Sequence, residues 1–459
     1  MDISFHSSGV KKLGDFPGQC NPFLLRWEKV SRGRDQDPAI LSSEGRVLRT
    51  FGEIGNRAED FSHRLRGCST VAVACGQGPL WAEAILGVWL AGGVVIPCAE
   101  GDLVCGILPA GAWKIHADGR VEPGAGGDRP EGVDLLKVTS GTTTGRRLLA
   151  FPASALLADA DHVASGMGIG PGDRNLAVIP FEHSYGLTNL LGCLLAVGSS
   201  VVLSGGRLPR EIAEACRHAE AGVLPGVPAI FRALNVLDSL PESLRLAVSA
   251  GALLPAADAR EFHRKFGRKI HSFYGASECG GICFDGSEDP DVPEGFVGKS
   301  LPGVRLAEQV SGEGILLRVE GPALGTGTIP SLPGDTLEMG YFQPPDLLQR
   351  QGEGYQIIGR ESDFINVGGK KANPAAIEKV LREIPGVREA AVFGAPSPGG
   401  GERVAACVVA AIDEAALKAG AAARLPSWQI PRVWLRVGSL PVNARGKLSR
   451  RALKERFFD

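Results

Sequence analysis

Short apolar runs alternate with amphipathic stretches along most of the chain. Four runs rich in aliphatic residues have the length of buried strands: 70–75, 175–180, 200–204 and 244–251. Two other segments, 211–220 and 256–266, repeat apolar residues at the spacing of a helix face. Because strands that alternate with helices build parallel sheets, we predict an α/β fold with a large N-terminal domain of mixed, mostly parallel sheets packed with helices.

The pattern changes after the segment 359–369, "GRESDFINVGG". The rest of the chain has the pattern of a compact α+β unit, with a helix over 374–383, strands over 389–395 and 403–411, and a short C-terminal helix. About 100 residues are enough for a separate domain. We therefore expect two domains, 1–359 and 360–459, with the boundary near Ser362.

Composition limits the class of protein. The 459 residues include 44% hydrophobic and 22% charged residues, which predicts more than one core and excludes disorder as the main state. Lys+Arg 49 and Asp+Glu 51 give a formal net charge of -2, without a dense basic run. Nucleic-acid binding requires a surplus of positive charge. We therefore expect a small-molecule partner and no nucleic acid.

The ten cysteines are scattered along the chain. The closest pair, Cys279 and Cys283, lacks the CxxC spacing and the nearby histidines of a zinc site, so we expect buried thiols in a reducing compartment. The first residues lack the apolar core of a signal peptide, and Glu83, three glycines and a proline interrupt the longest apolar stretch, 81–99. We expect a cytoplasmic protein without a membrane span; the oligomeric state stays open.

Residues 137–151, "KVTSGTTTGRRLLAF", place an apolar lead-in before small and hydroxyl residues and two arginines. Backbone N–H groups, hydroxyls and arginines together suit a polyphosphate. A Walker A loop is excluded, because the Gly-Lys-Ser at 298–300 has Pro293 five positions before its glycine, where that loop needs a glycine. The G-x-G-x-x-G of a dinucleotide-binding fold is also missing from the first strands. Taken alone, the segment could equally be a surface turn.

Further motifs follow in order. They are "PFEHSYGL" (180–187), "GVPAIFRAL" (226–234), "SAGALL" (249–254), "FYGASECGG" (273–281), "GRESDFINVGGKKANPAAIE" (359–378) and "LPVNARGKLSRRAL" (440–453). Together with the hydroxyl-rich loop, which resembles "TSGTTGxPK", these motifs resemble those of the adenylate-forming, AMP-binding enzyme superfamily, in its acyl/aryl-CoA synthetase branch. Seven motifs in order over about 300 residues are far more specific than any one of them.

The resemblance implies a nucleotide site. In the family, the tyrosine of "YGxTE" stacks on adenine, the hydroxyl position faces phosphate and the glutamate holds Mg²⁺, which carries over to Tyr274, Ser277 and Glu278. Asp335 and Asp346 compete for the ribose position, and Asp346 has the family spacing to the Gly-Arg pair that ends at Arg360. The ATP and AMP contacts implied in full are Thr139, Ser140, Gly141, Thr142, Thr143, Arg147, Gly251, Ala252, Tyr274, Gly275, Ala276, Ser277, Asp346 and Arg360.

The resemblance also implies catalytic residues, a pocket and a hinge. Lys447 takes the position of the C-terminal lysine of adenylation, with Glu278 and His183 as the other catalytic residues. The acyl pocket implied is His183, Tyr185, Gly186, Gly280 and Gly281; Ser362 takes the hinge position of a mobile C-terminal lid domain; and Gly368 and Gly369 line the pantetheine channel.

The activity implied is the ATP-dependent conversion of a carboxylic acid to an acyl-adenylate with release of pyrophosphate, followed by transfer to a pantetheine thiol. The co-substrates are ATP, Mg²⁺ and CoA, or phosphopantetheine on an acyl carrier protein. Apolar residues beside Gly280 and Gly281 predict an uncharged pocket for an aryl or medium-chain acyl group.

Two other functions stay open. Glu182 could pair with the ammonium of an amino acid, which would suit an amino-acid-activating domain. A nucleotide-binding protein without turnover would tolerate Thr144 and Pro344-Pro345, which stand where the family has glycine and a Thr-Gly pair.

Overall fold

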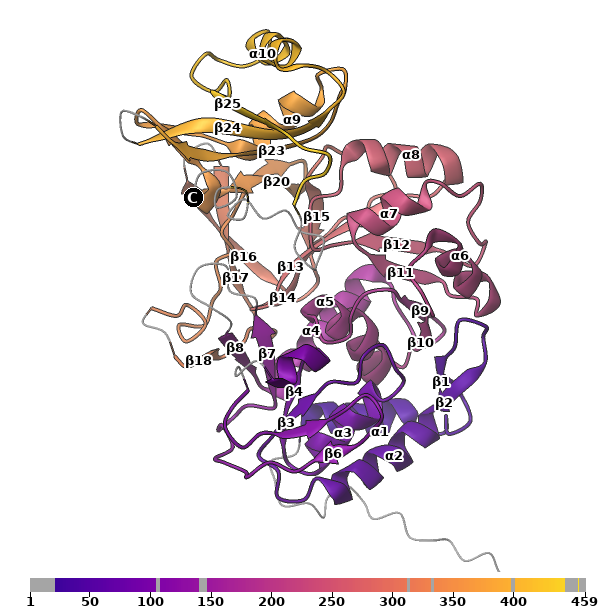
Figure 1. Ribbon diagram of the computed structural model, residues 1–459. Helices are drawn as coiled ribbons and strands as arrows, with labels where there is room; N and C mark the ends of the chain where they lie inside the picture. Colours follow the sequence, from indigo (N-terminus) through magenta and orange to yellow (C-terminus); the bar gives the residue numbers. More distant parts are fainter. Residues whose placement is uncertain are drawn as a thin grey trace, which may run out of the picture.

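The computed structural model describes residues 21–104, 108–139, 147–311, 314–331, 334–397, 401–441 and 453 (Figure 1). Within these residues, sheets of thirteen and seven strands form the large N-terminal part. A three-stranded sheet forms the small C-terminal part, which lies at the opposite end of the molecule from β3 and β6. The mixed α/β fold with a large N-terminal and a small C-terminal domain is confirmed.

The thirteen-stranded sheet is parallel in its middle and antiparallel at both ends. The parallel strands, in spatial order, are β1 (Pro38–Leu41), β10 (Ser200–Leu203), β9 (Arg174–Ala177), β11 (Val223–Gly226), β12 (Leu246–Ser249) and β13 (Ile270–Ala276). The antiparallel strands are β2 (Val47–Thr50) beside β1, and β14 (Gly280–Phe284), β15 (Phe296–Ser300), β20 (Gly354–Arg360), β19 (Asp346–Gln351), β17 (Gly314–Glu320) and β16 (Arg305–Ser311) beyond β13. Hairpins with short connections therefore extend the expected parallel sheet with antiparallel pairs.

The seven-stranded sheet carries the hairpin on either side of the hydroxyl-rich segment. Its spatial order is β18 (Gly327–Ile329), β8 (Arg147–Phe151), β7 (Leu135–Thr139), β4 (Val94–Pro97), β3 (Thr70–Val73), β5 (Trp113–Ile115) and β6 (Val121–Glu122). β7 and β8 are antiparallel, with Thr139 opposite Arg147. The four strands predicted from apolar runs are confirmed as β3, β9, β10 and β12, each with slightly different ends.

Helices cover these sheets. They are α1 (Pro22–Ser31), α2 (Phe51–Arg64), α3 (Trp81–Leu90), α4 (Ala153–Met167), α5 (Ser184–Gly186), α6 (Pro209–His218), α7 (Pro228–Leu234), α8 (Ala256–Phe266), the π-helical η3 (Leu187–Val197), and the short 3₁₀ segments η2 (Glu100–Val104) and η4 (Glu361–Asp363). The helices predicted over 211–220 and 256–266 are confirmed as α6 and α8.

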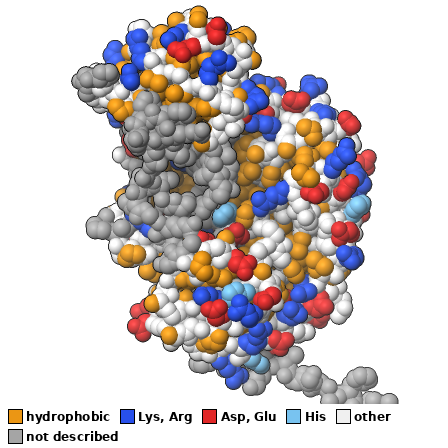
Figure 2. Space-filling model, viewed as in Figure 1, with side chains coloured by type: hydrophobic (Ala, Val, Ile, Leu, Met, Phe, Trp, Pro, Cys, Tyr) orange, Lys and Arg blue, Asp and Glu red, His pale blue; other side chains and the backbone are white. Residues whose placement is uncertain are grey.

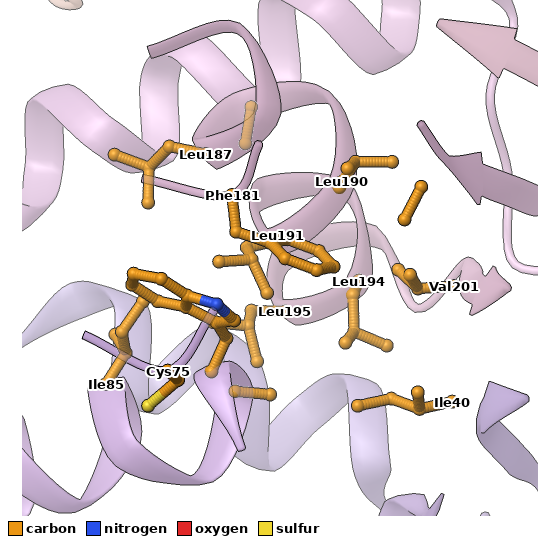
Figure 3. Close-up of a cluster of buried hydrophobic side chains, with 14 of the residues drawn as sticks. Ile40, Cys75, Ile85, Phe181, Leu187, Leu190, Leu191, Leu194, Leu195 and Val201 are labelled. Carbon is orange, nitrogen blue, oxygen red and sulfur yellow. The ribbon is translucent and has the colours of Figure 1, made fainter. Parts of the chain in front are cut away.

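A large apolar core holds η3 between the two sheets. Figure 3 shows leucines of η3, among them Leu191 and Leu195, close to Ile85 of α3, while Leu194 points toward Ile40 and Val201 of the thirteen-stranded sheet. These side chains are all at most 3% exposed. Because burial of each such side chain stabilises the fold by about 1.5–3 kcal/mol, the core fixes η3, and with it the segment 180–186 that leads into the helix.

The small domain contains the predicted helix and both predicted strands. Its elements are β21 (Ile365–Val367), β22 (Lys370–Ala372), α9 (Pro374–Arg382), β23 (Val387–Pro396), β24 (Glu402–Ala410), α10 (Glu414–Ala422) and β25 (Val433–Arg436). The sequence analysis missed α10 and β25, and the predicted C-terminal helix lies outside the described residues except for position 453. Contacts between this domain and the rest include the ion pair of Arg382 with Glu294 at 2.7 Å and the hydrogen bond at 2.8 Å that the Asn373 side-chain amide donates to the Ile358 carbonyl.

The eight cysteines in the described ranges are all buried free thiols, as expected. Across those same ranges, none of the helices combines the length and the apolar character needed to cross a membrane. Figure 2 shows basic and acidic side chains interspersed over the described part of one face, without a broad patch of one sign.

Candidate active site

Three residues far apart in the sequence meet at the end of β13. The Tyr274 hydroxyl donates to Asp346 Oδ2 at 2.9 Å, across 72 positions of sequence. Arg360 Nε donates to Asp346 Oδ1 at 2.8 Å. The register of the β19–β20 hairpin sets the second contact, because Asp346 lies directly opposite Arg360. The structure therefore brings together Tyr274, Asp346 and Arg360, as the resemblance implied.

Burial makes this network electrostatically strong. It raises the pKa of the Tyr274 phenol well above its usual range, and the neighbouring Asp346 charge raises it further. Burial lowers the pKa of Arg360, but the charge and hydrogen bond of Asp346 more than offset this effect, so the pKa lies above its ordinary value. At neutral pH the phenol is thus a neutral donor and the guanidinium is charged.

The competing aspartate serves a different purpose. Asp335 accepts from Thr328 Oγ1 at 3.1 Å and from the Leu337 backbone N–H at 3.0 Å, so it organises its own turn. Only Asp346 of the two bonds to Tyr274. The geometry therefore agrees with the choice of Asp346 that the motif spacing suggested.

Glu278 lies in the turn between β13 and β14. Its backbone carbonyl accepts from Gly325 N at 2.9 Å, which ties the turn to the loop before β18. Burial raises the pKa of its carboxyl; Lys137 opposes this effect and Asp335 adds to it. A carboxylate whose ionised form is disfavoured by desolvation gains from a cation.

The residues around Glu278 fit Mg²⁺ in part. Carboxylate oxygen is a hard ligand of the kind that Mg²⁺ prefers. Among the described residues, no group of three His, Cys, Asp or Glu side chains could hold a metal alone. Mg²⁺ commonly takes one or two carboxylates and completes its coordination with substrate phosphates and water. Glu278 therefore fits a site of that kind, shared with a nucleotide.

The segment 180–187 lies against the same turn. Ser184 Oγ donates to Ser277 Oγ at 3.0 Å, so two motifs separated by 93 positions are in direct contact. The Tyr185 hydroxyl donates to the Val248 carbonyl at 2.9 Å, and its ring lies 5.7 Å from that of Phe273. At Gly186 an added Cβ would lie 2.0 Å from the Pro180 carbonyl oxygen, so only glycine permits this close approach. His183 directly precedes α5.

A buried carboxylate packs against the backbone of Gly280 and Gly281. The uncharged acyl pocket expected beside these glycines stays a prediction. Asp159 of α4 is 3% exposed and accepts from Gly281 N at 2.9 Å and from Thr188 Oγ1 at 2.7 Å. A Cβ at Gly280 would lie 2.2 Å from the Asp159 carboxyl, so the glycine is required by this packing. The composition of the segment 280–283 gave no sign of a carboxylate that comes from another element.

Lys137 of β7 is a second residue that the sequence analysis missed. It is 4% exposed, its ammonium lies 4.0 Å from the centre of the Phe151 ring, and it donates to the Ser277 carbonyl at 3.5 Å. Burial lowers the pKa of this lysine, while Asp159, Cys279 and Glu278 oppose that effect. A lysine between apolar residues in a strand was a signal for a buried charge, because a strand buried on both faces leaves no solvent side.

Other predicted site residues lie apart or outside the described ranges. Gly251 and Ala252 are exposed after β12, and Gly251 has φ +83°. Gly368 and Gly369 form the β21–β22 turn of the small domain with φ of +57° and +84°. Ser362 lies in η4, directly after β20. Thr139 Oγ1 donates to the Arg147 carbonyl at 3.3 Å. The predicted residues outside the described ranges are Ser140, Gly141, Thr142, Thr143 and Lys447.

Comparison with known proteins agrees with this geometry. Residues 127–311 match the AMP-binding enzyme family, and residues 376–447 match the AMP-binding enzyme C-terminal domain. The sulfoacetate–CoA ligase of Cupriavidus necator is 29% identical over 352 residues, which cover 70% of this chain and 67% of that protein. The 2-hydroxy-7-methoxy-5-methyl-1-naphthoate–CoA ligase of Streptomyces carzinostaticus is 30% identical over 351 residues, 71% of this chain and 62% of that protein.

A solved structure shows the same fold. ATP-bound MatB from Rhodopseudomonas palustris superposes with a TM-score of 0.82 at 24% identity, over 95% of this chain and 99% of that chain. The family matches, together with a large α/β domain and a small C-terminal domain, define an adenylate-forming ligase. The chain belongs to the AMP-binding enzyme family of acid–thiol ligases, and the relatives named above are CoA ligases.

Proposed function

We propose that the chain activates a carboxylic acid with ATP, forms an acyl-adenylate and releases pyrophosphate, and then transfers the acyl group to the thiol of CoA. The observation that carries this proposal is the Tyr274–Asp346–Arg360 network, which joins three family motifs by hydrogen bonds of 2.9 and 2.8 Å. A carboxylate held between a phenol and a guanidinium can accept from both ribose hydroxyls. Two of the relatives are named as CoA ligases, which supports CoA as the acceptor of the acyl group.

The nucleotide would lie across the carboxyl ends of the parallel strands, where α/β proteins bind ligands. The Tyr274 ring would face the adenine, Asp346 the ribose, and Ser277 the α-phosphate. Arg360 keeps Asp346 in place, because their ion pair at 2.8 Å fixes one carboxylate oxygen. Glu278 would be the protein ligand of Mg²⁺, which neutralises charge on the phosphates of ATP.

Adenylation brings an anionic carboxylate to an anionic phosphate, so positioning and charge neutralisation carry the chemistry. Lys447 would supply the cation for this step from the C-terminal end of the chain. The small domain would then rotate about the hinge at Ser362 to admit the pantetheine thiol past Gly368 and Gly369. In that second step the thiol sulfur attacks the acyl carbon, and AMP leaves with the electron pair of the broken C–O bond.

The acid pocket would lie between the segment 183–186 and Gly280–Gly281. The contact between Ser184 and Ser277 at 3.0 Å supports this position, because Ser277 lies in the turn that leads to the two glycines. An aryl or medium-chain acyl group remains the proposed substrate class. The Asp159 carboxylate against the two glycines and the Lys137 ammonium against the Ser277 carbonyl favour acids whose reacting end, rather than the tail, approaches these polar groups.

The test is pyrophosphate release with Mg-ATP over a panel of aryl, fatty and amino acids, measured without any thiol. The matched control is Lys447→Ala. We expect release with one class of acid and its loss in the variant. CoA and a phosphopantetheinylated carrier protein are then compared as acceptors for that acid. ATP binding without release for every acid would contradict the proposal and favour a nucleotide-binding protein without turnover.

A further inference from the structure

Lys137 has a buried ammonium that the described fold does not satisfy. An ammonium carries three N–H donors. Its one hydrogen bond, to the Ser277 carbonyl at 3.5 Å, is at the outer limit for such a contact. Within the described ranges, no carboxylate forms an ion pair with it, and the remaining contact is the face of Phe151 at 4.0 Å. A charge that is 96% buried therefore retains donors for a further group.

A second buried lysine shows how this fold satisfies a charge for stability alone. Lys269 Nζ pairs with Asp285 at 2.7 Å and donates to the Ser287 carbonyl at 2.9 Å and to Ser287 Oγ at 2.7 Å. The ammonium there has an ion-pair partner and two hydrogen-bond acceptors. Lys137 lacks such a set, although Asp159 and Glu278 are near enough to influence it electrostatically. A purely structural role of Lys137 does not explain why it has fewer partners than Lys269.

The position of Lys137 indicates what its donors bind. The ammonium lies below the turn 277–279, against the carbonyl of Ser277, whose hydroxyl contacts Ser184 of the proposed acid pocket. Asp159, which packs against Gly280, and Glu278, the proposed cation ligand, both act electrostatically on the ammonium. This is where the carboxylate of the acid and the α-phosphate of ATP would approach each other.

We propose that Lys137 binds substrate at the adenylation site, and that its ammonium donates to an anionic oxygen that comes from the carboxylate of the acid or from the α-phosphate of the nucleotide. This inference rests on the proposed function. It adds to the motif residues a cation supplied by β7, in the middle of the large domain. Because the large domain supplies this cation, the contact persists whatever the orientation of the small domain.

The experiment uses the full chain and the acid identified by pyrophosphate release. Lys137→Met removes the charge and keeps the length of the side chain, and Lys137→Arg keeps a cation. We expect Lys137→Met to fold and to lose roughly 10- to 100-fold in kcat/KM for pyrophosphate release, with partial rescue in Lys137→Arg. The matched control, Lys269→Met, should change stability while leaving kcat/KM per folded molecule unaltered.

Two arms separate the two sources of the anionic oxygen. If the acid supplies it, Lys137→Met raises KM for the acid and leaves the Kd of AMP, measured without acid by calorimetry, unchanged. If the α-phosphate supplies it, the Kd of AMP rises by a similar factor.

Wild-type kcat/KM and wild-type AMP affinity in Lys137→Met would overturn the inference while leaving the proposed function intact. If the wild-type protein releases no pyrophosphate with any acid, the proposed function itself is contradicted. Should Lys137→Met not fold, Lys137→Arg decides: unchanged KM for both substrates and an unchanged Kd for AMP would overturn the inference, because a moved cation must alter a direct contact.

Discussion

A buried lysine lies near each end of β13, and the two ammonium groups differ in the acceptors around them. Lys269 directly precedes the strand, at the edge where parallel strands begin, and its ammonium has a carboxylate and two further acceptors within 2.9 Å. Lys137 lies against the turn that follows the strand, and among the described residues its one hydrogen-bond acceptor is the Ser277 carbonyl at 3.5 Å. The charge at the amino end of the strand is therefore paired within the fold, whereas the described part of the chain offers no close acceptor to the ammonium at the carboxyl end. In α/β sheets, ligands bind at the carboxyl ends of strands, so the unsatisfied charge lies on the side where a ligand completes it.

The largest expected effect is the loss of stability in Lys269→Met. This substitution leaves the Asp285 carboxylate, 1% exposed, without its cation, and a broken buried pair costs about 3–5 kcal/mol. Urea unfolding followed by circular dichroism measures the free energy of unfolding, at a pH where the native state is otherwise stable. A variant as stable as the wild type would remove the contrast between the two lysines.

The second effect concerns the nucleotide network at the carboxyl end. Asp346→Asn removes the charge that holds Arg360 and accepts from Tyr274, and a hydrogen bond to a charged group contributes about 1.5–3 kcal/mol. We expect the Kd of AMP to rise by roughly 10- to 100-fold in calorimetry. The matched control is Asp335→Asn, at the competing aspartate, which should leave the Kd of AMP within about twofold of the wild type. Equal effects of the two variants would refute the assignment of Asp346.

The third effect is a pH dependence that distinguishes the two lysines. In the native state, burial lowers the pKa of Lys137 against the opposing charges of Asp159, Cys279 and Glu278. Between that lowered pKa and the ordinary value of 10.5, the unfolded chain binds more protons than the native chain, so wild-type stability rises with pH relative to Lys137→Met.

The variant should therefore be at least as stable as the wild type at neutral pH, and its advantage should shrink in alkaline solution by at most about 1.4 kcal/mol per pH unit. Unfolding curves of both proteins between neutral and alkaline pH give this difference. A difference that stays constant over the whole range would show that Lys137 keeps its ordinary pKa in the folded chain.

The smallest effect is expected at Ser184. Ser184→Ala removes its hydrogen bond to Ser277, a contact between neutral groups that contributes about 0.5–1.5 kcal/mol. KM for the acid should rise by a few-fold while the melting temperature changes little. An effect on KM as large as that of Lys137→Met would mean that the alignment of the two motifs, rather than the ammonium, controls binding of the acid.

Local patterns were enough to predict much of this fold. The apolar runs that became β3, β9, β10 and β12 are bounded by polar residues, and the helix face of α8 repeats at the correct period. The spacing from Asp346 to Arg360 also indicated that these two residues belong to one site, since they lie on one hairpin whose register fixes their contact. Contacts within a hairpin can therefore be predicted from one continuous segment of the sequence. The ribose-binding role of Asp346 stays a prediction.

Contacts between elements that are distant in the sequence could not be predicted in this way. Asp159 lies on α4, and nothing in the helix pattern shows that its carboxylate meets the backbone of Gly281, 122 positions later. The weakly amphipathic α10 and the short β25 were missed for a related reason: their place in the small domain comes from packing against α9 and β24. The Asp159 carboxylate beside Gly280 was missed for the same reason. A buried charge is stabilised by groups that are close in space, and these need not be its neighbours in sequence.

The β19–β20 hairpin also bears on the order of events during turnover. Asp346 begins β19, Arg360 ends β20, and the predicted hinge residue Ser362 follows two positions later. A torsional change at the proposed hinge would therefore act on the end of the hairpin, where Arg360 pairs with Asp346, the residue proposed to bind ribose. Release of AMP and rotation of the small domain would then be coupled. The rate of domain rotation, and not the affinity for AMP alone, would set the rate of product release.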